Sequence, residues 1–346
     1  NMITTKPLNI EGNLTSFSIN TLDDSSSKDS SRPLEAAFVH SSNRGNWGYS
    51  LSGSIQERNN IEEGTRESNW LTVEEMALTE GYFRVDKSAA GITNNNQRAD
   101  GKTFYQEPSA YIIKDNDRER VNAQATAQYE FESAVLTLDY TYSKVDFSSN
   151  GQMFGSWLGG WGTTAGTINA NGAYTDVTVG DRGYDHQLIW GNTESENNSL
   201  GFNLTFQASD ALSFEVDFHS SSAEKLGTEL PNEMGFVTPA DATITHVNGG
   251  PNGINTFSYS KDFTVNDFSH SGLFYRDASK ENEMDQLQLK GEWLNLDGGF
   301  LKGVKFGITT TESEFSDVRS ELNTPLAPVV PAASYLFTRT SLNGFM

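Results

Sequence analysis

The chain has 346 residues, of which 36% are hydrophobic and 11% aromatic, with 31 glycines and no cysteine. Its 24 basic and 46 acidic residues give a net charge of −22, which argues against a nucleic-acid partner because phosphate backbones attract basic surfaces. The lack of cysteine excludes disulfides and thiolate metal sites, and no apolar run approaches the ~18 residues that a membrane-spanning helix needs. Two classes remain, a soluble all-β protein and a chain that crosses a membrane as β-strands.

Both ends of the sequence indicate a segment of a longer protein. The chain begins at Asn1 without a basic and apolar leader, and it ends at Met346 shortly after a proline-rich stretch. We therefore expect further sequence on both sides, with a complete protein that has frayed ends as the alternative.

Alternation of apolar and polar residues predicts β-strands, because successive side chains of a strand point to opposite faces of a sheet. A first strand is expected over 13–22, with Phe17 and Ile19 on its apolar face. The segments 34–40 and 47–55 follow it and are separated by a short turn. Two strands so close in sequence form an antiparallel hairpin.

The same hairpin unit recurs three times further along the chain. Its segments are 121–131 with 136–143, 200–207 with 212–219, and 286–293 with 304–308. The sequence thus predicts about nine antiparallel strands. An open sheet edge cannot face lipid, so a membrane-embedded form of this sheet needs more strands than these.

Long segments without sustained periodicity separate the hairpins, at about 59–118, 149–194, 223–281 and 314–346. Compact soluble domains rarely carry structureless loops longer than ~15 residues, whereas outer-membrane barrels combine tight turns on one side with long loops on the other. Aromatic residues near strand ends fit the girdles of such barrels: Trp47, Tyr49, Tyr129, Tyr140, Tyr142 and Trp293. The polar face carries mostly Gln, Asn, Thr and Ser, which suits a hydrated lumen.

Several short motifs resemble TonB-dependent outer-membrane receptors of the large proteobacterial branch. The first eight residues, NMITTKPL, are similar to the strand that closes the plug domain in that family. The motifs LSGSIQER at 51–58, RERVN at 118–122, DQL at 285–287 and GEW at 291–293 follow in the family's order. Their order and spacing carry the resemblance, which covers the layout of the whole chain.

The resemblance implies an all-β, antiparallel transmembrane β-barrel of about 22 strands, occluded by an N-terminal plug. Residues 1–8 would form the last strand of the plug domain, and residues 9–346 the N-terminal part of the barrel, with short periplasmic turns and long extracellular loops. TonB and its inner-membrane complex would energise import of a scarce nutrient through the plug, in the outer membrane of a Gram-negative bacterium. The TonB box would lie upstream of Asn1.

The segment 149–194 holds the candidate ligand-binding residues. Aromatic rings exposed among glycines can stack on sugar rings, and nearby polar groups can bond hydroxyls. The candidates are Trp157, Trp161, Tyr174, Tyr184, Asp185, His186 and Trp190. Alternatively, these aromatics pack the loop onto its neighbours. Surplus acid on the loops favours a neutral or cationic ligand unless basic residues line the pocket, and an oligosaccharide is favoured over a siderophore.

No enzymatic activity and no cofactor are expected from the sequence. Its five histidines lack zinc-binding spacing, and no nucleophile elbow is present. Acidic loop residues, Glu62 with Glu63 and Asp115 with Asp117, could bind calcium, with plain solvated charge as the alternative reading. A passive porin of about 16 or 18 strands and a surface-exposed β-rich adhesin remain alternatives to the importer.

Overall fold

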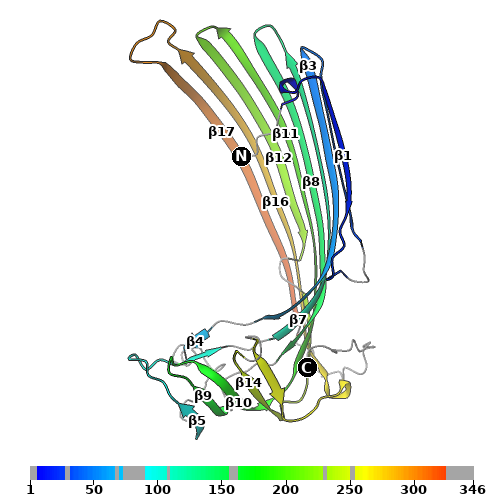
Figure 1. Cartoon of the computed structure of the whole chain (residues 1–346), viewed down its shortest axis with the longest axis vertical. Helices are drawn as coiled ribbons and strands as arrows, with labels where there is room; N and C mark the ends of the chain where they lie inside the picture. Colours follow the sequence, from blue (N-terminus) through cyan, green and yellow to red (C-terminus); the bar gives the residue numbers. More distant parts are fainter. Residues whose placement is uncertain are drawn as a thin grey trace.

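The computed structural model of the chain describes residues 6–27, 32–66, 70–72, 90–106, 110–155, 163–228, 232–249 and 254–324. These residues are all-β, with two 3₁₀ turns, η1 (Pro7–Asn9) and η4 (Val265–Asp267), and no α-helix among them. One large antiparallel sheet contains most of the strand residues. A smaller sheet lies at one end of its long strands (Figure 1).

Ten strands form the large sheet, in the order β1-β2-β3-β7-β8-β11-β12-β16, with β17 and β13 also paired to β16. They are β1 (Asn13–Thr21), β2 (Leu34–Asn43), β3 (Trp47–Arg66), β7 (Ala110–Glu130), β8 (Ala134–Gly155), β11 (Asp185–Ser209), β12 (Leu212–Gly227), β13 (Asn232–Val237), β16 (Ser269–Leu294) and β17 (Gly303–Thr324). All their pairings are antiparallel, and β13 continues beyond β12 between β11 and β16. The prediction of an all-β chain built from antiparallel hairpins is therefore confirmed.

Short connections join the hairpins at one end of the large sheet, which we call the turn end; the other end is the far end (Figure 1). Three of these connections span only residues 44–46, 131–133 and 210–211. In the first of them Gly45 has φ +80°, a left-handed conformation that glycine adopts without steric cost. Its N–H donates a hydrogen bond of 3.0 Å to Oδ1 of Asn43, which fixes the turn.

The strands extend further toward the far end than the sequence predicts. β3 and β7 stay paired out to Arg66 and Ala110, and β8 and β11 stay paired out to Gly155 and Asp185. The expectation of structureless segments over 59–118 and 149–194 is therefore wrong for these parts. Both faces of the sheet carry charged and amide side chains here, so the alternation of apolar and polar residues disappears while backbone pairing continues.

The small sheet lies at the far end and holds the buried core of the described residues. Its order is β15-β14-β10-β9-β5, and only the β5–β9 pairing is parallel. Its strands are β5 (Gly91–Asn94), β9 (Thr163–Ile168), β10 (Tyr174–Arg182), β14 (Ala242–Val247) and β15 (Thr256–Tyr259). The core side chains are Tyr105, Ile168, Tyr174, Val177, Val179 and Ile244. A further pair, β4 (Trp70–Thr72) and β6 (Phe104–Gln106), lies nearby (Figure 1).

Residues 1–8 are expected to form the last strand of a plug domain, but the described part of this segment contains a 3₁₀ turn. Residues 1–5 lie outside the described residues, and Pro7–Asn9 form η1 in place of the end of a strand. Pro7 suits the first position of such a turn because its fixed φ matches and its missing N–H would have no partner there. Asn43 holds the turn against β2, since its Nδ2 donates to the carbonyl oxygens of Leu8 and Ile10 at 2.9 and 3.0 Å.

Candidate functional site

The pairing register fixes which residues share a face of the large sheet, because paired residues of antiparallel strands point to the same side. We call one side the apolar face and the other, where η1 lies, the polar face. One row of the apolar face crosses seven strands, from β3 to β17: Trp47, Tyr129, Leu136, Leu204, Val216, Leu289 and Ile308. The next row adds Leu138, Phe202, Phe218 and Leu287. The apolar face is therefore a continuous surface.

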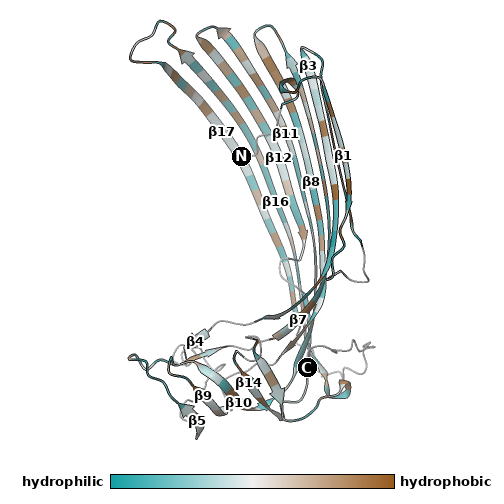
Figure 2. Cartoon of the chain, viewed as in Figure 1, coloured by the Kyte–Doolittle hydropathy of each residue, from teal (hydrophilic) through white to brown (hydrophobic). Residues whose placement is uncertain are grey.

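This apolar face is exposed. Ile308 is 69% exposed, Phe17 68% and Leu200 52%, and the buried core cluster lies in the small sheet instead. Figure 2 shows hydrophobic residues recurring along the long strands toward the turn end. Burying one such side chain is worth about 1.5–3 kcal/mol, and soluble monomers rarely expose apolar patches above a few hundred Å². An exposed apolar surface of this extent is unusual for a soluble monomer.

A sharp border limits the apolar face toward the far end. On β11 the run from Phe206 to Leu200 is followed on the same face by Asn198, Glu196 and Glu194. At about 3.4 Å per residue the run measures about 20 Å, close to the ~25 Å apolar band of outer-membrane barrels. Beyond the border one row carries four acids on adjacent strands, Glu57, Glu119, Asp146 and Glu194, and continues on β12 with Leu226. We call the region between the turns and this border the apolar belt.

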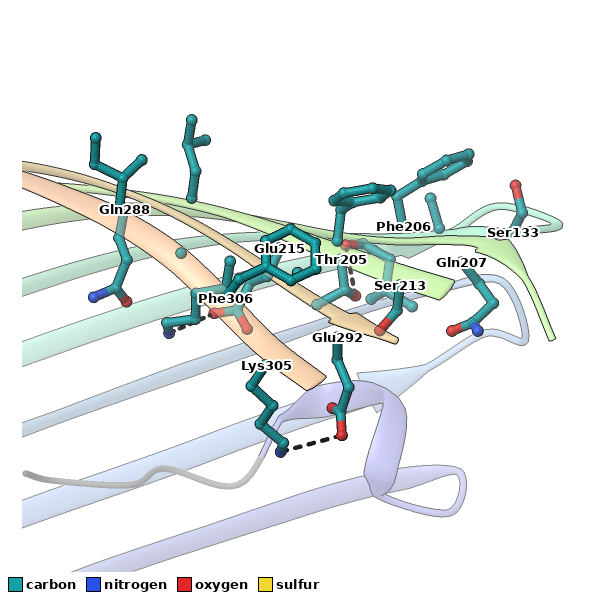
Figure 3. A pocket seen from close by; sticks show the side chains of 18 of the residues that line it. Ser133, Thr205, Phe206, Gln207, Ser213, Glu215, Gln288, Glu292, Lys305 and Phe306 are labelled. Atoms are coloured by element: carbon teal, nitrogen blue, oxygen red, sulfur yellow. Dashed lines mark hydrogen bonds and ion pairs between the residues drawn. The ribbon is translucent and has the colours of Figure 1, made fainter. Parts of the chain in front are cut away.

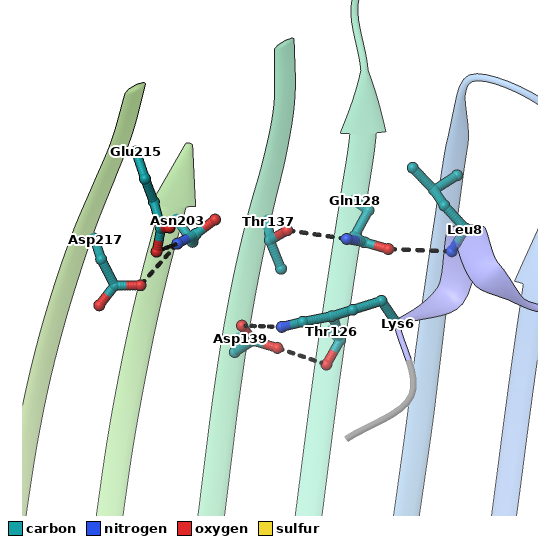
Figure 4. A network of polar contacts seen from close by, with 9 residues as sticks. All are labelled: Lys6, Leu8, Thr126, Gln128, Thr137, Asp139, Asn203, Glu215 and Asp217. Carbon is teal, nitrogen blue, oxygen red and sulfur yellow. Dashed lines mark hydrogen bonds and ion pairs between the residues drawn. The ribbon is translucent and has the colours of Figure 1, made fainter. Parts of the chain in front are cut away.

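The polar face is built from hydrogen-bonded amide, hydroxyl and carboxylate side chains (Figure 4). Lys6 reaches from the chain before η1 to Asp139 on β8, with 3.2 Å between Nζ and Oδ2. Thr126 donates to the other carboxylate oxygen of Asp139 at 2.8 Å. The backbone N–H of Leu8 donates to Oε1 of Gln128 at 3.1 Å. The segment that precedes β1 is thus attached to the polar face of β7 and β8.

Near the turn end a depression of about 770 Å³ lies against β8, β11, β12, β16 and β17. Two ion pairs line it, Lys290 with Glu215 at 3.2 Å and Lys305 with Glu292 at 3.3 Å. Figure 3 shows Lys305 and Phe206 pointing to opposite sides of the sheet. The charged pairs therefore lie on the same side as η1.

An aromatic cluster surrounds two of the predicted ligand residues at the far end. The ring centroid of Tyr184 lies 5.3 Å from that of Tyr259 and 5.6 Å from that of Phe268. The ring of His186 stacks on Phe154 at 4.5 Å. Offset and edge-to-face contacts at these distances are favourable packing arrangements. These rings pack against one another, which agrees with the alternative that aromatics of this segment pack it onto its neighbours.

Burial sets the protonation states in this cluster. It raises the pKa of Tyr184 above its ordinary value, with a smaller contribution from the charge of Asp185. It also lowers the pKa of His186 to about 4. Desolvation disfavours the charged form of any ionisable group, so both rings are neutral at pH 7.

The other predicted ligand residues do not converge on one site. Tyr174 is completely buried in the core of the small sheet, so the expectation of an exposed ring at this position is wrong. Asp185, His186 and Trp190 lie in β11, in which Asp185 points to the side opposite His186 and Trp190 because alternate residues face opposite ways. Trp157 and Trp161 lie outside the described residues.

The predicted calcium ligands lie in strands instead of loops. Glu62 and Glu63 are successive residues of β3 and therefore point to opposite faces. Asp115 and Asp117 lie in β7 opposite Ile61 and Asn59. The sequence places them in a loop only because alternation is lost in this segment.

A set of basic residues on the polar face, just beyond the level of the border, is not evident from the sequence. Arg58 on β3 lies opposite Arg118 on β7, and Lys225 on β12 lies opposite Lys280 on β16. The partners are about 60 residues apart in the chain, so no local motif connects them. The one indication in the sequence is the alternation of acidic and basic residues at 117–120, which predicts that Arg118 and Arg120 lie on the same face of a strand.

Comparison with known proteins does not assign the chain to a family. No protein-family model, curated protein or solved structure matches the chain. In the part that the structure describes, no helix has the length and apolar character required to cross a membrane. No group of three or more His, Asp or Glu suited to a metal ion occurs among those same residues.

Proposed function

We propose that this chain is part of a TonB-dependent importer in the outer membrane of a Gram-negative bacterium. The apolar belt contacts lipid, and the polar face lines the water-filled interior of a barrel. The exposed belt, with its abrupt acidic border, is the observation that supports this proposal most directly. Charged side chains on the lipid face are unfavourable in the bilayer midplane and tolerated near its surface, which fits the position of the border.

Barrel closure is part of the proposal. The strands β1 and β17 each have one paired neighbour, β2 and β16, among the described residues. An unpaired edge cannot face lipid, since its backbone N–H and C=O groups would find no hydrogen-bond partners there. In the proposed barrel, further strands of the same protein pair with β1 and β17.

The attachment of Lys6 and Leu8 to the polar face supports a plug upstream of them. A chain that enters the barrel from an interior domain has to approach β1 along the polar face, and the contacts of Lys6 with Asp139 and of Leu8 with Gln128 lie on that face. In the proposed mechanism the far-end loops capture the ligand, and TonB with its inner-membrane complex rearranges the plug so that the ligand passes. No covalent chemistry is involved.

Uptake by cells that carry the full-length protein tests this proposal. We expect the protein in the outer-membrane fraction, soluble only with detergent, and ligand accumulation that stops when TonB is deleted or the proton-motive force is dissipated. Accumulation that continues without TonB would identify a passive porin. Release of the native protein into buffer without detergent would identify a soluble or surface-attached protein.

A further inference from the structure

The charges of the large sheet are segregated by face just beyond the apolar belt. Three successive rows of the polar face contain seven basic side chains and three acidic ones, Glu35, Asp317 and Glu321. The basic residues, which we call the basic patch, are Arg58, Arg118, Arg120, Lys225, Arg276, Lys280 and Arg319. At the same level the apolar face carries rows of acids. A chain of net charge −22 thus presents a positive surface on one side only.

Like charges are placed directly opposite each other within the basic patch. Arg58 faces Arg118 across β3 and β7, and Lys225 faces Lys280 across β12 and β16. Directly opposed like charges destabilise a sheet, although Glu35 pairs with Arg58 and Asp317 pairs with Lys280. The other member of each pair, Arg118 or Lys225, forms no ion pair with a described residue, so an anion over the patch would relieve the remaining repulsion.

Several members of the basic patch are available to a ligand. Arg120 and Lys225 are exposed and form no ion pair with any described residue. Arg118 donates to the neutral Gln56 at 3.1 Å, and its Nε is buried without a hydrogen-bond partner. By contrast, the other four members form ion pairs within the sheet: Arg58 with Glu35 at 2.9 Å, Arg276 with Glu321 at 3.5 Å, and Lys280 and Arg319 with Asp317 at 3.9 and 2.8 Å.

Between the two halves of the patch the polar face has a hollow suited to a sugar. A depression of about 330 Å³ is lined by Val145, Ser195, Lys225, Lys280 and Asn282, with the ring of Phe315 beside them. In the next row Phe147 is 38% exposed and lies opposite Arg118. Exposed rings, hydroxyls and amides together provide the stacking surfaces and hydrogen bonds that a pyranose ring uses.

We infer that the basic patch binds an anionic oligosaccharide, one that carries uronate carboxylates or sulfate esters, on its way through the barrel. From Arg120 on β7 to Arg319 on β17 the patch crosses five strand spacings of about 4.8 Å, about 24 Å in total, which matches an extended chain with repeated charges better than a single small anion. Acidic rows on the opposite face repel such a ligand and steer it to the interior. This inference rests on the proposed import function and names its substrate class.

The separation of charges between the two faces changes the ligand that the net charge favours. Surplus acid favours a neutral ligand only if acidic and basic side chains are mixed on one surface. The pairing register of the large sheet instead places them on opposite faces. A neutral or cationic ligand is expected from the sequence unless basic residues line the pocket, and the basic patch supplies such residues on the polar face.

Binding to the full-length protein in detergent tests the inference. Hexagalacturonate, a sulfated hexasaccharide and neutral maltohexaose serve as probes, each measured by calorimetry at low and moderate salt. The double variant Arg120→Gln with Lys225→Gln removes two patch charges. The double variant Arg44→Gln with Lys302→Gln removes the same charge from connections at the turn end and is the matched control.

We expect the acidic probes to bind in a salt-dependent way, with a dissociation constant raised at least tenfold by the patch variant and unchanged by the control variant. Equal affinity for maltohexaose, or equal affinity of wild type and patch variant for both acidic probes, would overturn the inference. Thermal unfolding of both variants shows whether they remain folded. TonB-dependent uptake without anion selectivity contradicts this inference alone, whereas a protein absent from the outer membrane contradicts the importer.

Discussion

Lys225 on β12 and Lys280 on β16 lie directly opposite each other on the polar face of the large sheet. Their neighbours Glu224 and Glu281 form the corresponding pair of like charges on the other face. Such pairs are unfavourable by about 0.2–1 kcal/mol relative to neutral ones. Asp317 on β17 pairs with Lys280 at 3.9 Å and offsets part of the repulsion on the polar face.

Reversing one charge of this pair is expected to stabilise the protein. Lys225→Glu places opposite charges across β12 and β16, with the neutral Ser195 as its neighbour on β11, and raises the free energy of unfolding by about 0.2–1 kcal/mol. The same change at Lys290, which already pairs with Glu215 at 3.2 Å, should lower it instead. Thermal unfolding in detergent compares the two variants, and a loss of stability in both would show that the like-charge pair is not a source of strain.

A charge placed within the apolar belt should be far more costly than one placed beyond it. Phe218 and Ser222 lie on the same face of β12, on either side of the border. Arginine on the lipid face costs about 2–4 kcal/mol at the bilayer midplane and about 0–1 kcal/mol near the interface. We expect Phe218→Arg to reduce folding in lipid vesicles strongly and Ser222→Arg to have little effect; equal costs would place the border elsewhere.

The contact between Leu8 and Gln128 is expected to anchor the entry to β1. The side chain of Gln128 is largely buried, accepts from the N–H of Leu8 and donates to Thr137 at 3.0 Å. Gln128→Leu leaves the Leu8 N–H and the Thr137 hydroxyl without these partners, at a cost of about 1–3 kcal/mol. Gln128→Glu keeps the acceptor for Leu8 and should cost less. Proteolysis of the segment before β1 measures the difference.

The small sheet should weaken in mild acid. Burial lowers the pKa of His246 to about 4, and both ring nitrogens lack hydrogen-bond partners. The folded state therefore binds fewer protons than the unfolded state between the folded pKa of about 4 and the ordinary value near 6.5. The free energy of unfolding is therefore unaffected by His246 above about pH 6.5, and it decreases as the pH falls toward 4 because the unfolded state binds a proton that the folded state does not.

Limited proteolysis of the far end at pH 7.5 and pH 5 measures this effect. Cleavage in the small sheet should accelerate at pH 5 in the wild type and less so in His246→Leu, which cannot be protonated. The loss for one such histidine is at most about 3 kcal/mol over the full range. A His246→Leu variant with an unchanged pH response would assign the effect to another group, such as His186, whose pKa is also lowered to about 4.

Near the turn end the sequence was a sufficient guide to the fold. Alternation in segments such as 200–207 and 212–219 predicts both the strands and their hairpins, because one face there is uniformly apolar. Beyond the border the same strands continue with charges on both faces, and the pattern that reveals them is lost. The paired strands out to Arg66 and Gly155 could not be found by periodicity for that reason.

The candidate site depends on register, which a single sequence does not contain. The sequence predicts an exposed ring at Tyr174, yet this residue belongs to the core of the small sheet, where it pairs with Ile168 of β9 and its ring contacts Tyr105. Conversely, Arg58 and Arg118 form one surface only after β3 and β7 are aligned residue by residue. A shift of one residue would move either side chain to the opposite face.

Single-cysteine labelling tests the central claim, that one face of the large sheet contacts lipid and the other contacts water. The chain has no native cysteine, so each introduced thiol reports alone. Leu204 and Val216 pair on the apolar face, and their neighbours Asn203 and Asp217 pair on the polar face. Each of these four residues is replaced by cysteine in turn and labelled with a fluorophore. In lipid vesicles the account predicts that brominated lipid quenches the label at Leu204→Cys or Val216→Cys, and that aqueous iodide quenches it at Asn203→Cys or Asp217→Cys. Iodide quenching at all four positions, with no effect of brominated lipid, would contradict it.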